Sequence, residues 1–133
     1  MTKVINISEA TQLALHSMVY IAKSNGSSVT TKQIADTLGA SDNHLSKVMQ
    51  RLVKSGFVKS NRGPSGGFTM AMDPNVITLY DIYEAIEGKI DTNPCPFGKN
   101  ECFFDKCIFG NEVSRLSNEF INYFRKTRLI EAI

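Results

Sequence analysis

A glycine-rich turn that carries one arginine, Arg62, constrains the fold of this chain more than any other stretch. The turn has the sequence RGPSGG over residues 62–67 and lies between two short β-patterned runs, residues 57–61 and 68–72. It predicts the tip of a β-hairpin. Two helix-patterned segments separated by a glycine come directly before it. Helix, tight turn, helix and hairpin in this order are typical of a winged helix-turn-helix, whose usual ligand is duplex DNA.

Helix signals surround the hairpin. Four segments combine helical spacing of apolar residues with a Ser or Thr at the start and a glycine near the end. They are a helix at about residues 9–24 after Ser8, a short helix from Thr30 or Thr31 to Gly39, a helix from Ser41 to Gly56, and a helix from Thr78 to Gly88. We expect the second and third to form the helix-turn-helix pair, with the third as the recognition helix.

Positive charge gathers on this expected DNA-binding unit. The whole chain has a net charge of only +2, which is too mild to indicate a nucleic-acid ligand by itself. Residues 41–67, however, hold five cations against the single acid Asp42, a net charge of +4; the cations are Lys47, Arg51, Lys54, Lys59 and Arg62. Such one-sided charge is typical of a protein that binds a polyanion through one face.

Length and composition favour one compact domain with an appended helix. The chain has 133 residues, of which 42% are hydrophobic and 21% charged, as in ordinary globular proteins. No stretch approaches the roughly 20 apolar residues that a membrane span requires, and the first residues lack a signal-peptide core. We therefore expect a cytoplasmic protein without a membrane partner.

Three cysteines fall within one short segment. Cys95, Cys102 and Cys107 lie in or at the end of a Pro- and Gly-containing stretch over residues 89–106, and the rest of the chain has no cysteine. Their spacing matches neither paired zinc-ribbon motifs nor a redox CxxC motif. Buried single cysteines are the bland alternative, but the clustering favours a shared metal or iron–sulfur site. Such a site needs a further ligand.

The last helix, expected from about residue 107 or 108 to residue 126, carries an apolar seam. Its members alternate at steps of four and three residues: Phe109, Val113, Leu116, Phe120, and Tyr123 or Phe124. A small domain does not need this much extra apolar surface for its own core. The seam therefore predicts a dimer interface.

Together these motifs resemble the Rrf-two family of winged-helix transcriptional regulators, which includes regulators of iron–sulfur supply and repressors sensitive to nitric oxide. The resemblance covers nearly the whole chain. It rests on TQLAL at residues 11–15, QIA at 33–35 with LG at 38–39, LVKSGFV at 52–58, RGPSGGF at 62–68, ITLYDI at 77–82 with EAIEG at 84–88, and the cysteine segment. The wing followed by three cysteines is its most specific part.

The resemblance implies a homodimeric sensor. It divides the chain into a winged helix-turn-helix at residues 1–88, a cysteine-containing sensor loop at 89–107 and a dimerisation helix at 108–133. It implies a two-iron (2Fe-2S) or four-iron (4Fe-4S) cluster on the three cysteines, which aerobic preparation can remove, and a palindromic operator. It places DNA contacts on Ser41, Asn43, Ser46 and Lys47 of the recognition helix and on Arg62 of the wing. The charge of Arg51 beside these residues adds it to the predicted DNA contacts.

The fourth ligand of the cluster departs from the family pattern. Family members complete the cluster with a histidine one turn after the last cysteine or with an acid near the N-terminus of the other subunit. Here Gly110 follows in the first position and Gln12 stands in the second. Glu9, Asp105, an exogenous thiol and a solvent molecule all remain candidates for the fourth ligand.

Three other function classes compete with this hypothesis. The DNA-binding protein could lack a cluster and respond to thiol oxidation, zinc or a small effector. The winged helix could also dock a partner protein. An enzyme is disfavoured, because the sequence has no paired catalytic carboxylates, no Ser/His/Asp order and no nucleotide-binding glycine loop in a strand-to-helix setting. We assign no catalytic residue.

Overall fold

Helices dominate the computed structural model, which describes residues 7–64, 66–90 and 102–133. The helices and strands follow one another in this order: α1 (Glu9–Lys23), α2 (Thr31–Leu38), α3 (Asp42–Lys54), the strands β1 (Val58–Asn61) and β2 (Gly67–Met70), α4 (Leu79–Glu87), α5 (Glu112–Lys126) and the 3₁₀ turn η1 (Leu129–Ala132). This is the predicted winged helix-turn-helix with an additional C-terminal helix. No helix in the described part of the chain is both long and apolar enough to cross a membrane.

Side-chain caps begin the helices as the sequence predicts. The Ser8 hydroxyl accepts the Thr11 N–H at the start of α1, and the Ser41 hydroxyl accepts the His44 N–H at the start of α3. Thr30, rather than Thr31, caps α2 in a reciprocal box with Gln33, and Thr78 caps α4 in the same way. Each cap satisfies main-chain donors that a helix start leaves unpaired.

The hairpin is antiparallel, with Val58 opposite Met70 and Asn61 opposite Gly67. A third segment joins its edge, because Val29 and Phe68 exchange two main-chain hydrogen bonds of 3.0 and 2.7 Å. Gly67 allows this close approach: its φ is +145°, and a Cβ there would lie 2.6 Å from the Val29 carbonyl oxygen. The wing is therefore fixed to the loop before α2.

The core lies between α1, α2, α3 and α4, and the C-terminal segment closes it. Fully buried side chains from all parts of the fold meet there: Met18, Ile34, Leu45, Met49, Leu52, Ile77, Ile82 and Leu129. Leu129 belongs to η1, and its N–H donates to the Ile77 carbonyl at 2.7 Å. Residues beyond α5 thus return to the unit that the sequence predicts to end at Gly88.

The last helix begins later than the sequence predicts. The start expected at residue 107 or 108 is wrong, because Gly110 and Asn111 have φ values of +59° and +62°, a left-handed conformation that a right-handed helix cannot contain. Helix α5 therefore begins at Glu112.

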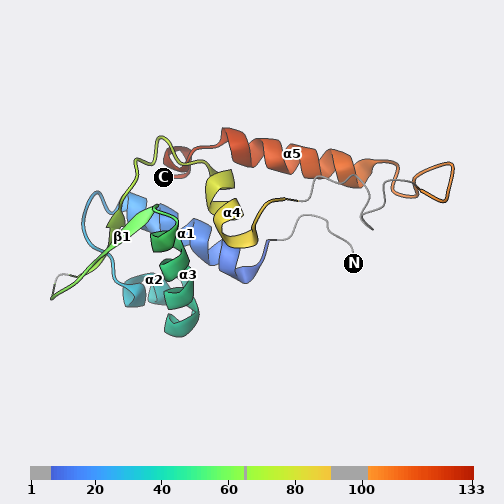
Figure 1. Ribbon diagram of the computed structural model, residues 1–133. Helices are drawn as coiled ribbons and strands as arrows, with labels where there is room; N and C mark the ends of the chain where they lie inside the picture. Colours follow the sequence, from blue (N-terminus) through green and yellow to red (C-terminus); the bar gives the residue numbers. More distant parts are fainter. Residues whose placement is uncertain (1–6, 65, 91–101) are drawn as a thin grey trace.

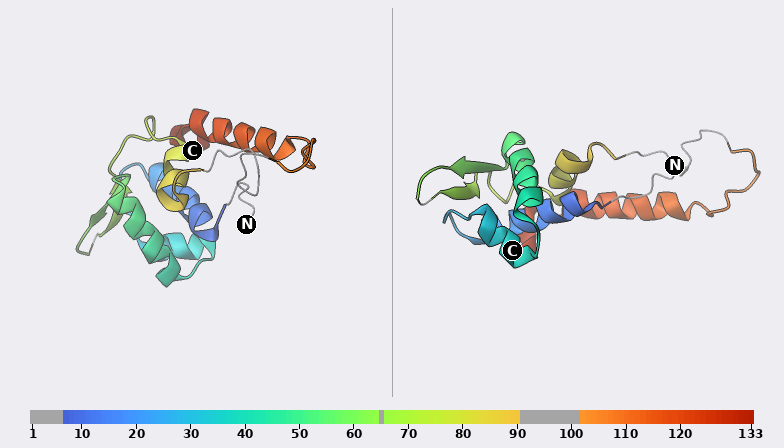
Figure 2. Two further views of the ribbon diagram at one scale, coloured as in Figure 1. Left: turned by 45° about the vertical axis from the view of Figure 1, so that its right-hand side comes forward. Right: turned by 90° about the horizontal axis from the view of Figure 1, so that it is seen from below.

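The wing and residues 102–111, which hold Cys102 and Cys107, lie at opposite ends of the described part of the chain (Figure 1). Helix α5 runs along one side, and its N-terminal end projects beyond the other helices toward residues 102–111. Figure 2 shows the same separation from two further directions. Any influence of the cysteines on the wing must therefore pass through the helices between them.

Candidate nucleic-acid interface and cysteine segment

The buried stripe of α3 determines which of its side chains face outward. Leu45, Val48, Met49 and Leu52 are buried against the core. At 3.6 residues per turn, Asn43 and Lys47 fall on the opposite side, and both are exposed. Ser41 is exposed at the N-cap and Ser46 is half-buried. The N-terminal half of α3 thus gathers four of the predicted DNA contacts on an outward surface.

The wing extends this surface. Arg62 is exposed near the tip of the hairpin, and Ser65 of the same turn lies outside the described residues. A hollow of about 410 Å³ separates the hairpin from α3, with Ser46 and Gln50 on the helix side and Ser60 and Phe68 on the strand side. Recognition helix and wing therefore border one continuous concave region, in which side chains of both elements can reach the same ligand.

Arg51 differs from the other predicted contacts in what its side chain binds. Its guanidinium Nη2 donates to the main-chain oxygens of Ala85 at 3.2 Å and Ile86 at 2.8 Å, in the last turn of α4. Sequence reasoning grouped Arg51 with the DNA-facing cations because of its charge and spacing. The residue is exposed one turn after Lys47, but its guanidinium points to α4.

Hydrogen bonds from the start of α1 also bind the end of α4. The carboxylate of Glu87 accepts hydrogen bonds from the hydroxyls of Ser8 and Thr11, the latter at 2.7 Å. Burial raises the pKa of the Glu87 carboxyl, but the two hydroxyl bonds and the positive charge of Arg51 outweigh burial and hold that pKa below its ordinary value. Sequence reasoning missed this cluster. Its one signal was Thr11, a polar residue on the same face of α1 as the buried Ala14 and Met18.

The cysteine segment is exposed throughout its described part. Cys102 and Cys107 are free and exposed, and Cys95 lies outside the described residues. The Phe104 N–H donates to the Cys102 sulfur at 3.4 Å. Main-chain N–H groups of Asn111, Phe109 and Gly110 lower the pKa of the Cys107 thiol, because they stabilise its thiolate form.

No completed metal site forms within the described residues. Over residues 7–64, 66–90 and 102–133, no three His, Cys, Asp or Glu side chains converge in an arrangement that could hold a metal ion. Asp105, a candidate fourth ligand, is exposed in the same segment as Cys102 and Cys107. The three-cysteine prediction itself depends on Cys95 and stays a prediction.

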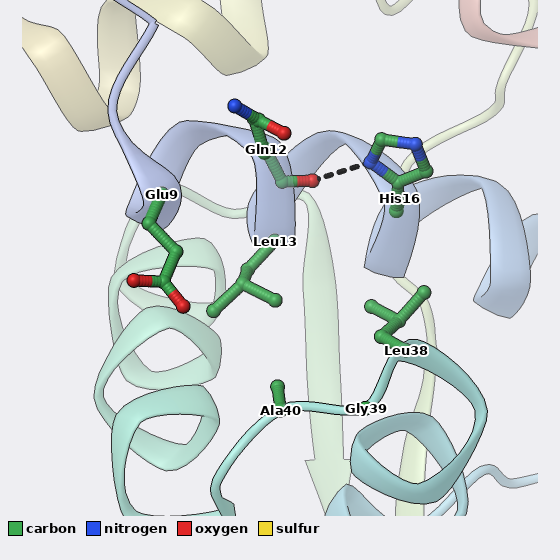
Figure 3. A pocket seen from close by; sticks show the side chains of 7 residues that line it. All are labelled: Glu9, Gln12, Leu13, His16, Leu38, Gly39 and Ala40. Atoms are coloured by element: carbon green, nitrogen blue, oxygen red, sulfur yellow. Dashed lines mark hydrogen bonds between the residues drawn. The ribbon is translucent and has the colours of Figure 1, made fainter.

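Another candidate fourth ligand, Glu9, lines a pocket between α1 and the turn that joins α2 to α3. Gln12 and His16 also line this pocket from α1, and Leu38, Gly39 and Ala40 line it from the other side (Figure 3). The Nδ1 atom of His16 donates to the Gln12 carbonyl at 2.6 Å. Glu9 also approaches α3, with its Oε1 atom 3.8 Å from Nδ1 of His44.

One part of the apolar seam of α5 packs against α4 of the same chain, and another part is exposed. Phe120 and Phe124 pack edge-on against Tyr83 of α4 in the same chain, with ring centroids 5.9 Å apart in each pair. Leu116 and Tyr123 stay exposed, by 50% and 60%. The predicted interface therefore narrows to the outward part of the seam.

Known proteins match this chain over nearly its whole length. A family model described as "Rrf2: Iron-dependent Transcriptional regulator" matches residues 7–133. The transcriptional regulator NsrR of Bacillus subtilis is 32% identical over 100 residues, which cover 74% of this chain and 68% of that protein. The regulator IscR of Escherichia coli O1:K1 is 29% identical over 122 residues, covering 90% and 75%. The solved structure of CymR, the global cysteine regulator of B. subtilis, matches with a TM-score of 0.77 and 27% identity, covering 96% of this chain and 95% of that one.

Proposed function

Because the chain belongs to the Rrf2 (Rrf-two) family of transcriptional regulators, we propose that it is a homodimer that binds a palindromic operator and whose DNA affinity depends on Cys95, Cys102 and Cys107. Members of this family regulate transcription and are not enzymes. Such a regulator works in the cytoplasm, where it reaches DNA.

The outward surface of α3 and the wing carries the DNA-binding part of the proposal. Ser41, Asn43, Ser46 and Lys47 would reach phosphates and base edges in the major groove, because the N-terminal half of a recognition helix is what enters that groove. Arg62 at the wing tip would contact the backbone or the adjacent minor groove. The exposed Leu116 and Tyr123 support dimerisation through α5.

The DNA face can be tested through salt dependence. Removing one phosphate contact lowers the slope of log affinity against log salt by about 0.9, hence by about 1.8 for both subunits of a dimer. We expect Lys47→Ala and Arg62→Ala to weaken operator binding and reduce the slope, whereas Lys126→Ala on α5 leaves both unchanged. Fluorescence anisotropy with an operator obtained by in vitro selection measures this, and unchanged affinity in both DNA-face variants would refute the assignment.

The sensing part rests on the environment of the two described thiols. Iron–sulfur clusters bind cysteine as thiolate and are tuned by hydrogen bonds to its sulfur. Main-chain N–H groups act on both Cys102 and Cys107, and both sulfurs are exposed, so these residues fit such a ligand set. A cluster held there with Cys95 would supply a group sensitive to nitric oxide, redox state or iron–sulfur supply.

A clusterless sensor is the second candidate, and one observation favours it. The solved structure with 27% identity belongs to a protein titled the global cysteine regulator of B. subtilis. The exposed Cys107 thiol, whose pKa is lowered, also suits direct oxidation or zinc binding.

Anaerobic purification separates the two candidates. We would quantify iron and sulfide and record the visible spectrum for the native chain and for Cys102→Ala. Stoichiometric iron and sulfide with colour, lost in the variant, supports the cluster. A colourless protein that still binds its operator after attempted reconstitution supports thiol or zinc control instead.

A further inference from the structure

The last turn of α4 is bound by two neighbouring helices at once. A helix leaves its last four carbonyl oxygens without partners inside the helix. In α4 two of these, on Ala85 and Ile86, accept the guanidinium of Arg51 from α3. The side chain of Glu87, the last residue of α4, accepts hydroxyl groups of Ser8 and Thr11 from the start of α1.

The position of Arg51 on α3 agrees with a role between helices. Arg51 follows His44 by seven residues, or nearly two full turns, so both lie on the same side of α3. His44 approaches Glu9 of α1 on that side, and Arg51 contacts α4. Lys47 lies one turn before Arg51, about 40° away around the helix, so Arg51 starts at the edge of the outward side and its guanidinium turns from there toward α4. The charge of Arg51 also has a partner in the nearby carboxylate of Glu87.

We propose that Arg51 is a positioning residue for DNA recognition: bound to the end of α4, it fixes the orientation of α3 in the fold and does not neutralise a phosphate. This inference rests on the proposed DNA-binding function. Its energetic basis is the planar Nη2 amino group of arginine, whose two N–H groups are fixed in direction, whereas the lysine ammonium ends one bond earlier on a flexible chain. Charge alone is therefore insufficient at this position.

Two substitutions separate positioning from phosphate binding. Arg51→Lys retains the positive charge, but its ammonium ends one bond short of the position of Nη2 and should hold the two α4 carbonyls less well. A phosphate-binding Arg51 would tolerate lysine, with affinity and salt slope close to native. A positioning Arg51 would not, because the orientation of α3 then relaxes. Arg51→Ala removes the charge as well, and Lys47→Ala provides the matched loss of a charge on the outward side of the same helix.

The measurement is affinity for the selected operator and for random duplex DNA, at several salt concentrations, with active protein concentration titrated for each variant. We expect both Arg51 variants to lose at least about tenfold in the ratio of operator to random affinity, because base contacts discriminate the operator and a misplaced α3 weakens them. Their salt slope should stay within about 0.3 of native, whereas Lys47→Ala should lower it by about 1.8. A purely structural role would lower the active fraction without changing that ratio.

Two outcomes would overturn the inference. One is a lysine variant with native affinity and an alanine variant whose salt slope falls as in Lys47→Ala, which would make Arg51 a phosphate contact. The other is a native operator-to-random ratio in both Arg51 variants. Failure of the native chain to discriminate its operator from random DNA would instead remove the proposed function itself.

Discussion

The winged helix-turn-helix differs from the cysteine segment in how many contacts within the chain stabilise it. In the first, side-chain caps begin every helix, and buried residues from four helices fix their packing. In the second, residues 102–111 are exposed, including Phe103 at 93% and Ile108 at 89%. The helix-turn-helix and wing are thus held in place by contacts within the chain. The apolar and thiol groups of residues 102–111 remain exposed and can contact a ligand or another molecule.

Truncating an apolar side chain in each region gives the largest expected contrast. Leu52 in α3 is fully buried, so Leu52→Ala should lower the free energy of unfolding by about 2–5 kcal/mol. Ile108→Ala removes an exposed side chain and should change it by less than about 0.5 kcal/mol. Urea unfolding at fixed protein concentration measures both. A large loss in Ile108→Ala would break the comparison, since it would mean that this segment is packed in solution.

Alanine at one glycine in each region should give the next largest contrast. At Gly67 the new Cβ would meet the Val29 carbonyl at 2.6 Å, and we expect a loss of roughly 2–4 kcal/mol. At Gly110 the Cβ meets open space, and only the left-handed backbone is strained, which costs about 1–2 kcal/mol. Thermal and urea unfolding of both variants provide the measurement. Equal losses would show that the wing does not depend on its contact with Val29.

The helix caps provide a smaller test. Thr30→Ala breaks the reciprocal cap of α2 and should cost about 1 kcal/mol. Asn111 begins α5 with no side-chain cap bond and a left-handed backbone, so Asn111→Gly should cost nothing measurable. Circular dichroism during urea unfolding compares the two. A loss in Asn111→Gly would reveal an interaction of that amide in solution.

Acid should produce the smallest effect, confined to the winged helix-turn-helix. The pKa of Glu87 is lower in the folded chain than its ordinary value of 4.5. Its stabilisation is therefore complete above that value and is lost as pH falls through the lowered pKa. Glu87→Gln should flatten this part of the dependence of unfolding free energy on pH, and Glu84→Gln on the same helix controls for the loss of one charge. An unchanged profile in Glu87→Gln would contradict the role assigned to its hydrogen bonds.

Local signals predicted most of the fold, and long-range contacts account for what they missed. Ser8, Ser41 and Thr78 identified helix starts because a cap depends on only a few neighbouring residues. The start of α5 was missed because Asn111 adopts a left-handed backbone that its identity permits but does not require. Arg51 illustrates the limit for the site: its partners lie 34 and 35 residues away, and charge alone placed it with the DNA contacts.

The division of the α5 seam has the same cause. Periodicity predicted one continuous apolar stripe, but it could not tell that Tyr83 would cover Phe120 and Phe124 from within the chain. Exposure then singled out Leu116 and Tyr123 as the outward part. Sequence reasoning thus found the apolar stripe but not which part of it the chain covers by itself.

The burial of Leu129 has a consequence for the order in which a new chain matures. The side chain belongs to the buried core of the winged unit, yet it is made after all of α5. A ribosome must therefore release the whole of α5 before that unit can close around its last core residue. A chain whose synthesis stops within α5 would lack a residue that the winged unit needs to complete its core.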